Sequence, residues 1–183
     1  MKKEIRLHGR GGQGAAMAAA ILATAFVTEG KYAAAFPMYG VERRGAPVTS
    51  FVRFGDETVR EKTQIYYPDC LIVIDPAQVK SPPVYSGLKP GGIMALNSPE
   101  PVKELPHGNL RVVGVVDATG IALDEIGAPI GNSCMLGAFA GTTKWVSLDS
   151  VLAALEQFFD GERLKRNMRS AERGFNEVTV TDW

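Results

Sequence analysis

The sequence predicts an α/β fold of three layers, in which a mostly parallel sheet is flanked by helices. Continuous apolar runs at 71–74 and 110–116 are typical of buried parallel strands. Stretches with helical apolar spacing alternate with these runs. The chain opens with a Rossmann-like βα unit, a strand followed by a glycine turn and a helix. Its 183 residues suffice for one well-buried domain and are short for two, so we expect a single domain over 1–183.

The first βα unit is the most informative stretch. Ile5 and Leu7 alternate with charged or polar residues, as in a strand with one apolar face. Four glycines follow from Gly9 to Gly14, and an uncharged, alanine-rich helix is expected over about 13–28. Glycine backbone and the free amides of a helix N-terminus suit phosphate or carboxylate. A turn that only packs tightly and binds nothing has the same pattern.

Gly9, Gly11 and Gly14 also match the dinucleotide-binding fingerprint. A nicotinamide site would need an acid at the end of the second strand to hold the ribose. The predicted second strand, 31–36, ends at Pro37 without an acid. The sequence therefore has the turn and lacks the ribose ligand.

The first helix lacks the charged face that a surface helix normally carries. Its polar residues are Gln13, Thr24 and Thr28. We expect both of its sides to be covered, either within the domain or by another protein.

A loop is predicted from Phe36 to Pro47, where prolines and glycines interrupt the pattern. It carries Glu42 followed by Arg43 and Arg44. The planar guanidinium group suits carboxylate and phosphate, which makes the loop a candidate anion clamp or docking surface. A solvated ion-pair loop explains the same composition.

The following stretch predicts a strand at 48–54 that turns at 55–56 and returns as a short hairpin strand at 58–60. Asp75 follows the buried run at 71–74 and is expected to cap the next turn. A loop is expected at 81–83, and the turn at 88–92 leads into the next strand. The remaining predicted elements are strands at 93–96 and 110–116 and helices at about 117–126, 134–142, 148–160 and 163–177.

Two details concern the later helices. Asn132 and Ser133 are expected to cap the helix of small residues that follows them, and Ser147 the next one. Gly137 and Gly141 are four residues apart, which predicts close packing of that helix in the core.

The composition excludes several classes of site. Twenty basic residues balance twenty acidic ones, so neither nucleic acid nor membrane is an expected partner. Cys70 and Cys134 lie far apart without a CxxC motif, which excludes a self-contained metal or iron–sulfur site of the usual spacing and fits a reducing compartment. No signal peptide is predicted, so we expect a cytoplasmic protein.

The candidate reacting groups are few. His8 ends the first strand and could touch a ligand, although a hydrogen bond to backbone is the simpler expectation. His107 is expected to be exposed. We assign no catalytic residue, and if the protein serves an enzyme, other chains would supply the reacting groups.

Several motifs together resemble one family. HGRGGQGA at 8–15, followed by FPMYGVERRGAPV at 36–48, is similar to the gamma subunit of the 2-oxoacid:ferredoxin oxidoreductases, the pyruvate synthase type. Ala46 stands where many relatives have glycine. Shorter matches in the expected order are LIVIDP at 71–76, LKPGG at 88–92, DATGIA at 117–122 and APIGNSCMLGA at 128–138.

The resemblance implies a heteromeric enzyme that converts a 2-oxoacid to CO2 and an acyl-CoA while reducing ferredoxin, or catalyses the reverse. It implies alpha, beta and delta-type partner subunits that carry thiamine diphosphate, Mg and iron–sulfur clusters, whereas this chain alone binds no cofactor. The isolated chain, which could form a homodimer, would be inactive.

The resemblance also places the gamma subunit on the CoA side of the active site. The residues that match its motifs, and are therefore candidate contacts to CoA, another anion or a partner subunit, are Arg10, Gly11, Gly12, Gln13, Arg43 and Arg44.

Two alternatives are kept. One is a stand-alone nicotinamide- or flavin-dependent oxidoreductase that uses the turn from Gly9 to Gly14. The other is a scaffold domain whose glycine turn only packs against neighbours. The motifs leave open which 2-oxoacid is used and in which direction the reaction runs.

Overall fold

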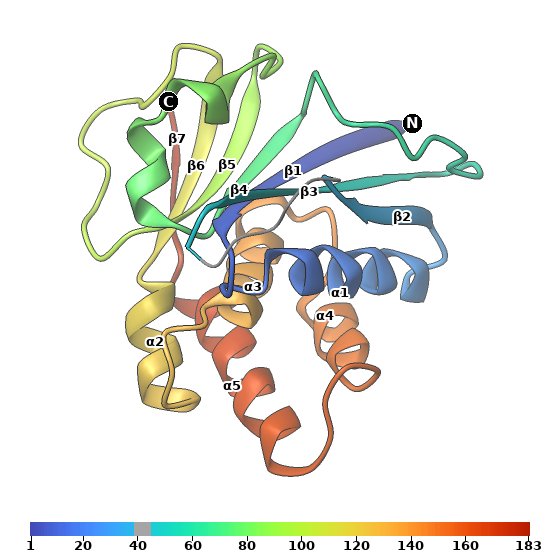
Figure 1. Cartoon of the computed structure of the whole chain (residues 1–183), viewed down its shortest axis with the longest axis vertical. Coiled ribbons are helices and arrows are strands. Elements are labelled where there is room, and N and C mark those ends of the chain that lie inside the picture. Colours follow the sequence, from blue (N-terminus) through green and yellow to red (C-terminus); the bar gives the residue numbers. More distant parts are fainter. Residues whose placement is uncertain (39–44) are drawn as a thin grey trace.

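The described residues of the computed structural model, 1–38 and 45–183, form a seven-stranded sheet with helices packed against it (Figure 1). This confirms the predicted α/β class. The strand order is β2-β3-β1-β4-β5-β6-β7. The strands are β1 (Lys2–Arg10), β2 (Tyr32–Pro37), β3 (Pro47–Gly55), β4 (Cys70–Val73), β5 (Gly92–Asn97), β6 (Leu110–Val116) and β7 (Thr179–Asp182).

The centre of the sheet is parallel and its margins are antiparallel. β1, β4, β5 and β6 pair in parallel, whereas β3 pairs antiparallel with both β1 and β2, and β7 pairs antiparallel with β6. β3 therefore separates β2 from β1. In a dinucleotide fold, the strand after the first helix lies directly beside the first strand. This chain has the glycine turn of that fold without the neighbouring strand that would carry a ribose-binding acid.

The predicted return strand at 58–60 is wrong. These residues have no regular secondary structure. The reason is that β1 and β2 already occupy the two sides of β3, which leaves no free edge for a hairpin partner.

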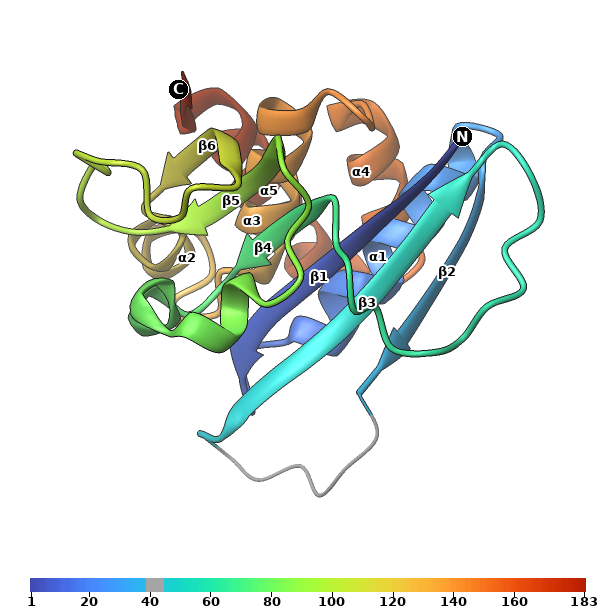
Figure 2. The same ribbon diagram turned by 90° about the horizontal axis from the view of Figure 1, so that it is seen from above.

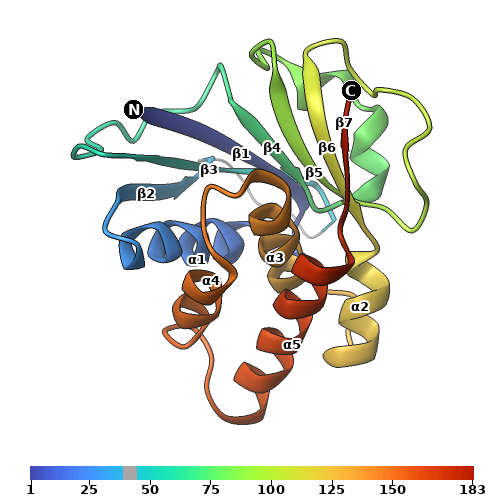
Figure 3. The same ribbon diagram turned by 180° about the vertical axis from the view of Figure 1, so that it is seen from behind.

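The five α-helices of the described residues cover one face of the sheet (Figure 3). Two short 3-10 helices, η1 (Pro76–Lys80) and η2 (Pro82–Tyr85), lie on the other face (Figure 2). The loop expected at 81–83 is thus partly helical. The helices are α1 (Ala15–Thr28), α2 (Ala118–Glu125), α3 (Asn132–Thr143), α4 (Leu148–Leu155) and α5 (Gly161–Glu177). None of the described helices combines the length and apolarity needed to cross a membrane.

α1 is buried along one side and open along the other. Ile21, Leu22 and Phe26 are fully buried in the main core between the helices and the sheet. Met17 is 42% exposed and Val27 55% exposed on the opposite side. The fold therefore covers one side of this uncharged helix and leaves an apolar strip facing outward.

Helices α3 and α5 touch through their glycines, which confirms the predicted close packing. A Cβ atom added at Gly137 would lie 1.8 Å from the carbonyl oxygen of Ala171. One added at Gly174 would lie 2.1 Å from the carbonyl oxygen of Cys134. Cys134 itself is fully buried, as expected for a small apolar residue. Backbone-to-backbone contact here leaves no room for a methyl group.

We predict that Gly137→Ala destabilises the fold by about 2 kcal/mol or more. The added methyl group must separate the two backbones, and this overpacking outweighs the roughly 1 kcal/mol that alanine gains over glycine within a helix. Urea unfolding followed by circular dichroism measures the change. Gly108→Ala is the control, because its Cβ would meet nothing within 4 Å, and it should change stability by less than about 0.5 kcal/mol. Equal stability of the two variants would refute close α3–α5 packing.

Candidate functional site

Polar residues gather where the parallel strands end. Arg10 closes β1, Asp75 follows β4, Asn97 closes β5, and Asp117 follows β6. The carboxyl ends of parallel strands share one edge of the sheet, which is where α/β proteins bind ligands. This edge is the candidate functional site.

The glycine turn leads from β1 into α1 at this edge. Gly12 and Gly14 have φ values of 90° and 75°, in the left-handed region that favours glycine. Gln13 stabilises the turn through two hydrogen bonds to Arg10. Its side-chain Oε1 accepts from the backbone N–H of Arg10 at 2.7 Å, and its backbone N–H donates to the Arg10 carbonyl at 3.1 Å. α1 has no side-chain N-cap, so the amides of its first turn remain donors for a ligand.

The Arg10 side chain is held by hydrogen bonds and is still partly exposed to a ligand. Its Nε donates to Asp75 Oδ2 at 2.5 Å, and its Nη1 donates to the carbonyl of Gly45 at 3.0 Å. The side chain is still 38% exposed. Asp75 also accepts from the amide of Ala77 at 3.3 Å, which confirms its predicted role as a cap. Arg10 is therefore a positioned cation whose charge is partly matched by Asp75.

The glycine turn also holds the last part of the predicted arginine loop. The Gly11 amide donates to the Ala46 carbonyl at 2.9 Å, and the Gly45 amide donates to the Gly11 carbonyl at 3.3 Å. Two motifs that are about thirty residues apart in sequence thus meet at one edge. Arg43 and Arg44 lie outside the described residues.

Three amide side chains that the sequence reasoning missed support this edge. Gln78 Nε2 donates to the Gly9 carbonyl at 2.7 Å, and Asn97 Nδ2 donates to the Ile74 carbonyl at 2.9 Å. Asn132 Nδ2 lies 3.4 Å from the Gly14 carbonyl. Their positions in the sequence could have indicated two of them, because Asn97 ends a strand and Asn132 begins a helix.

The cap of α4 is the predicted one, and the cap of α3 is not. Asp117 caps α2 by accepting from the amide of Gly120 at 2.9 Å, and Ser147 caps α4 by accepting from the amide of Ser150 at 3.1 Å. For α3, the residue at the cap position is Gly131. Asn132 is the first residue of that helix and contacts the glycine turn.

Arg6 and His8 form a buried polar pair on the sheet face opposite the α-helices. Arg6 is 6% exposed and His8 is 7% exposed. Arg6 Nε donates to His8 Nε2 at 3.0 Å. The partner of His8 is therefore a side chain, where the sequence suggested a backbone group. His107 is only partly buried rather than exposed, because its ring stacks on Tyr85 at 5.0 Å.

His8 is held neutral. Burial, followed by the positive charge of Arg6, lowers the pKa of His8 to about 3. A neutral imidazole has one acceptor and one donor nitrogen. Because Nε2 accepts from Arg6, the proton resides on Nδ1.

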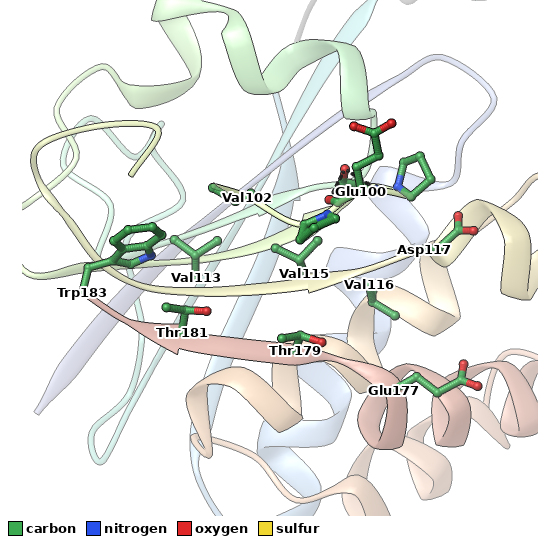
Figure 4. Close-up of a pocket in the computed structure, with 13 residues that line it drawn as sticks. Glu100, Val102, Val113, Val115, Val116, Asp117, Glu177, Thr179, Thr181 and Trp183 are labelled. Carbon is green, nitrogen blue, oxygen red and sulfur yellow. Dashed lines mark hydrogen bonds between the residues drawn. The ribbon is translucent and has the colours of Figure 1, made fainter. Parts of the chain in front are cut away.

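A groove beside the edge strand β7 does not suit an anion (Figure 4). Val113 and Val115 of β6 line it together with Trp183. The charged residues that line it, Glu100, Asp117 and Glu177, are acidic. Their charge repels phosphate, so the groove is not part of the candidate anion site.

The described residues do not offer a metal or cluster site. They contain no group of three or more His, Cys, Asp or Glu side chains placed to hold a metal ion. Cys70 and Cys134 are both free and buried, and burial raises the pKa of each thiol, to about 12 for Cys134. A thiol in that state is a poor ligand, because iron and zinc bind the thiolate.

A family model described as "Pyruvate ferredoxin/flavodoxin oxidoreductase" matches residues 4–177. The chain belongs to this family. The resemblance seen in the sequence motifs is thereby confirmed.

Two similar proteins are named as gamma subunits of oxidoreductases. The chain is 50% identical over 180 residues to a pyruvate/ketoisovalerate oxidoreductase common subunit gamma of Thermococcus kodakarensis, with 97% of each chain covered. It is 48% identical over 179 residues to an NADH-dependent phenylglyoxylate dehydrogenase subunit gamma of Aromatoleum evansii, covering 97% of this chain and 94% of the relative. The crystal structure of the pyruvate oxidoreductase subunit PORC of Thermotoga maritima matches with a TM-score of 0.86 and 39% identity, covering 99% of each chain. The expectation of a gamma-type oxidoreductase subunit is confirmed.

We predict that His8 makes the folded chain lose stability as the pH falls. Its folded pKa lies below its unfolded pKa of about 6.5, so the unfolded state binds the extra proton between about pH 6.5 and pH 3. Lowering the pH from 7 to 5 should therefore remove roughly 2 kcal/mol through this residue. Urea unfolding at the two pH values measures the loss.

Two variants isolate the contribution of His8. His8→Gln keeps an acceptor for Arg6 and removes the titration, so its loss of stability on acidification should be smaller by that amount. His107→Gln removes the other histidine and should lose as much stability as the parent. An identical pH dependence in His8→Gln and the parent would contradict a neutral, buried His8.

Proposed function

We propose that residues 1–183 act as one domain, the gamma subunit of a heteromeric, cytoplasmic 2-oxoacid:ferredoxin oxidoreductase. The complex would convert a 2-oxoacid and CoA into an acyl-CoA and CO2, and pass two electrons to ferredoxin, or catalyse the reverse reaction. Membership of the oxidoreductase family is the observation that carries this proposal.

The names of the relatives suggest that the gamma subunit does not determine which 2-oxoacid the complex uses. The chain is almost equally similar to a subunit named as common to pyruvate and ketoisovalerate oxidoreductases and to one named for phenylglyoxylate. These 2-oxoacids differ greatly in side chain. Because similar subunits serve reactions of these different 2-oxoacids, we expect the subunit to bind a reactant that the reactions share. We propose that this reactant is CoA.

The candidate edge supports a CoA-facing role. CoA carries phosphate groups, and the first-turn amides of α1 with the left-handed Gly12 and Gly14 are suited to an anion. Arg10 adds a cation held in place by Asp75. In this proposal, the segment from Arg10 to Gln13 binds and orients CoA, together with Arg43 and Arg44 from the adjoining loop.

The redox and decarboxylation chemistry is proposed to reside on partner chains. Thiamine diphosphate with Mg would supply the decarboxylation and the iron–sulfur clusters the electron transfer, carried by alpha, beta and delta-type subunits. The buried thiols and the lack of clustered ligands among the described residues do not fit a cluster in this chain. We therefore assign this chain no catalytic residue, and expect no turnover by the chain alone.

The outer side of α1 supports a role in assembly. Met17 and Val27 are large apolar residues at 42% and 55% exposure on a helix that has no charged side chain. An uncharged face of this kind is typical of a protein contact. We propose that a partner subunit covers it in the complex and that a second copy could cover it in the isolated chain.

We predict that Arg43→Ala and Arg44→Ala each raise the apparent KM for CoA by about tenfold in the complete complex. The reason is the loss of a charge-assisted hydrogen bond to phosphate. The complex is assembled with its partner subunits, and 2-oxoacid oxidation is followed by ferredoxin reduction. Size-exclusion chromatography reports whether assembly is intact.

Arg166→Ala is the matched control, because this arginine lies on α5 with 48% of its side chain exposed. It should leave the KM unchanged. Lost assembly with a normal KM in the remaining complex would show that the arginine loop is a scaffold contact. Oxidation of a 2-oxoacid by the isolated chain with a redox dye would contradict the subunit role altogether.

A further inference from the structure

A second pocket lies on the sheet face opposite the α-helices. Its volume is about 360 Å³. Arg6, His8 and Arg10 of β1 line one wall, because alternate residues of a strand point to the same face. Gln64, Tyr66 and Ser86 line it from the segments that cover this face. The alternation of side chains along β1 thus directs two arginines and a histidine into one cavity.

Arg6 brings a positive charge that no carboxylate among the described residues pairs with. Its Nη2 donates to the carbonyls of Val84 and Ser86 at 2.7 and 2.8 Å, and its Nη1 lies 3.4 Å from the carbonyl of Ile65. Neutral carbonyls satisfy hydrogen bonds but leave the net charge in place. A buried charge without a counter-ion is costly, and an anion nearby would relieve that cost.

Arg53 on the neighbouring strand shows the contrast. It is 3% exposed and also donates to backbone carbonyls, among them Thr63 at 2.6 Å. Its Nε, however, donates to the carboxylate of Glu4 at 2.8 Å. The same polar layer therefore supplies a counter-ion for one buried arginine and none, within the described part of the chain, for the other.

His8 turns a donor toward the pocket. Its Nε2 is occupied by Arg6, which leaves the proton on Nδ1. No described residue accepts a hydrogen bond from Nδ1, and this nitrogen is not among the fully buried polar atoms, so it is accessible from the pocket that the ring lines. The pocket that the ring lines is where an acceptor would sit.

Arg10 completes the lining at the end of β1. Asp75 binds its Nε, and Asp75 is not among the residues that line the pocket. Among residues 1–38 and 45–183, no acidic residue lines the pocket. The described lining thus holds Arg6 without a counter-ion, Arg10 with a charge that Asp75 partly matches, and several donors, which are the properties of a site for an oxyanion.

We propose that this pocket binds a small carboxylate or phosphate group, with His8 Nδ1 as the donor and the charges of Arg6 and Arg10 as the attraction. The group could be a free anion or the charged end of a larger ligand. This inference does not rest on the proposed function, because the pocket lies on the other face of the sheet from α1 and its described lining comes from this chain.

The test uses the full chain labelled with 15N-histidine and observed by NMR. The chain has two histidines, and His107→Gln assigns their signals. Inorganic phosphate and acetate are titrated separately at pH 7, with sodium chloride at matched ionic strength as the reference. We expect the Nδ1 signal of His8 to shift saturably with at least one of the two anions and the signals of His107 to stay in place.

A pair of arginine variants tests the charge. Arg10→Gln should weaken the binding about tenfold through loss of a charge on the lining. Arg111→Gln removes an arginine that pairs with Asp182 far from the pocket lining and should leave the binding unchanged. The Arg10 variant leaves the buried Arg6–His8 pair intact, so it remains informative where a substitution of Arg6 would disturb folding.

The outcomes separate clearly. A shift of His8 with phosphate alone identifies a phosphate site, and one with acetate assigns a carboxylate site. The absence of a saturable shift, or equal shifts at both histidines, would overturn the proposal. Because the measurement uses the chain without partners or CoA, its failure would leave the proposed role in the complex unaffected.

Discussion

The alternation of residues along β1 is the constraint on which the rest of the structure depends. β1 pairs with β3 on one side and with β4 on the other. Ile5 and Leu7 point into the core beneath the helices, whereas Arg6 and His8 point to the opposite face. A shift of one residue in the pairing would place two arginines and a histidine in the apolar core. The register is therefore strongly fixed, and with it the position of the glycine turn.

That fixed register brings the candidate site together. The turn after β1 receives the backbone of Gly45 and Ala46 through two hydrogen bonds, because β3 begins directly beside the end of β1. The sheet thus positions the end of the arginine loop beside the glycine turn that leads into α1. Arg10, fixed by Asp75 at the N-terminus of η1, borders both the glycine turn and the pocket on the other face. The end of β1 therefore contributes to two surfaces, the glycine turn and the pocket.

Most of the fold could be predicted from the sequence, because the spacing of apolar residues indicates which side of each element is buried. Apolar runs located the central strands, and alanine content, capping residues and helical spacing located the five α-helices of the described residues, although α4 ends at Leu155 and not at 160. β7 was missed because its four residues are exposed and mostly polar, so no pattern of burial marks them. The pairing of β7 with β6 is a tertiary contact that a local pattern does not contain.

The candidate site was predicted in part, for the same reason. The glycine turn and Arg10 carry a recognisable motif, whereas the burial of Arg6 depends on carbonyls of Val84 and Ser86, about eighty residues away. Alternation in β1 shows which residues share a face but not what covers that face. The polar layer could therefore be seen only in the folded chain. Arg43 and Arg44 lie outside the described residues, so their part in the site stays a prediction.

Hydrogen–deuterium exchange on the assembled complex, with and without CoA, tests the central claim most directly. The account predicts that CoA slows exchange of the amides in peptides covering residues 9–17, while peptides covering β7 at the far edge of the sheet remain unchanged. Unchanged exchange at 9–17 while CoA protects only other subunits would contradict a ligand-facing role for the end of β1.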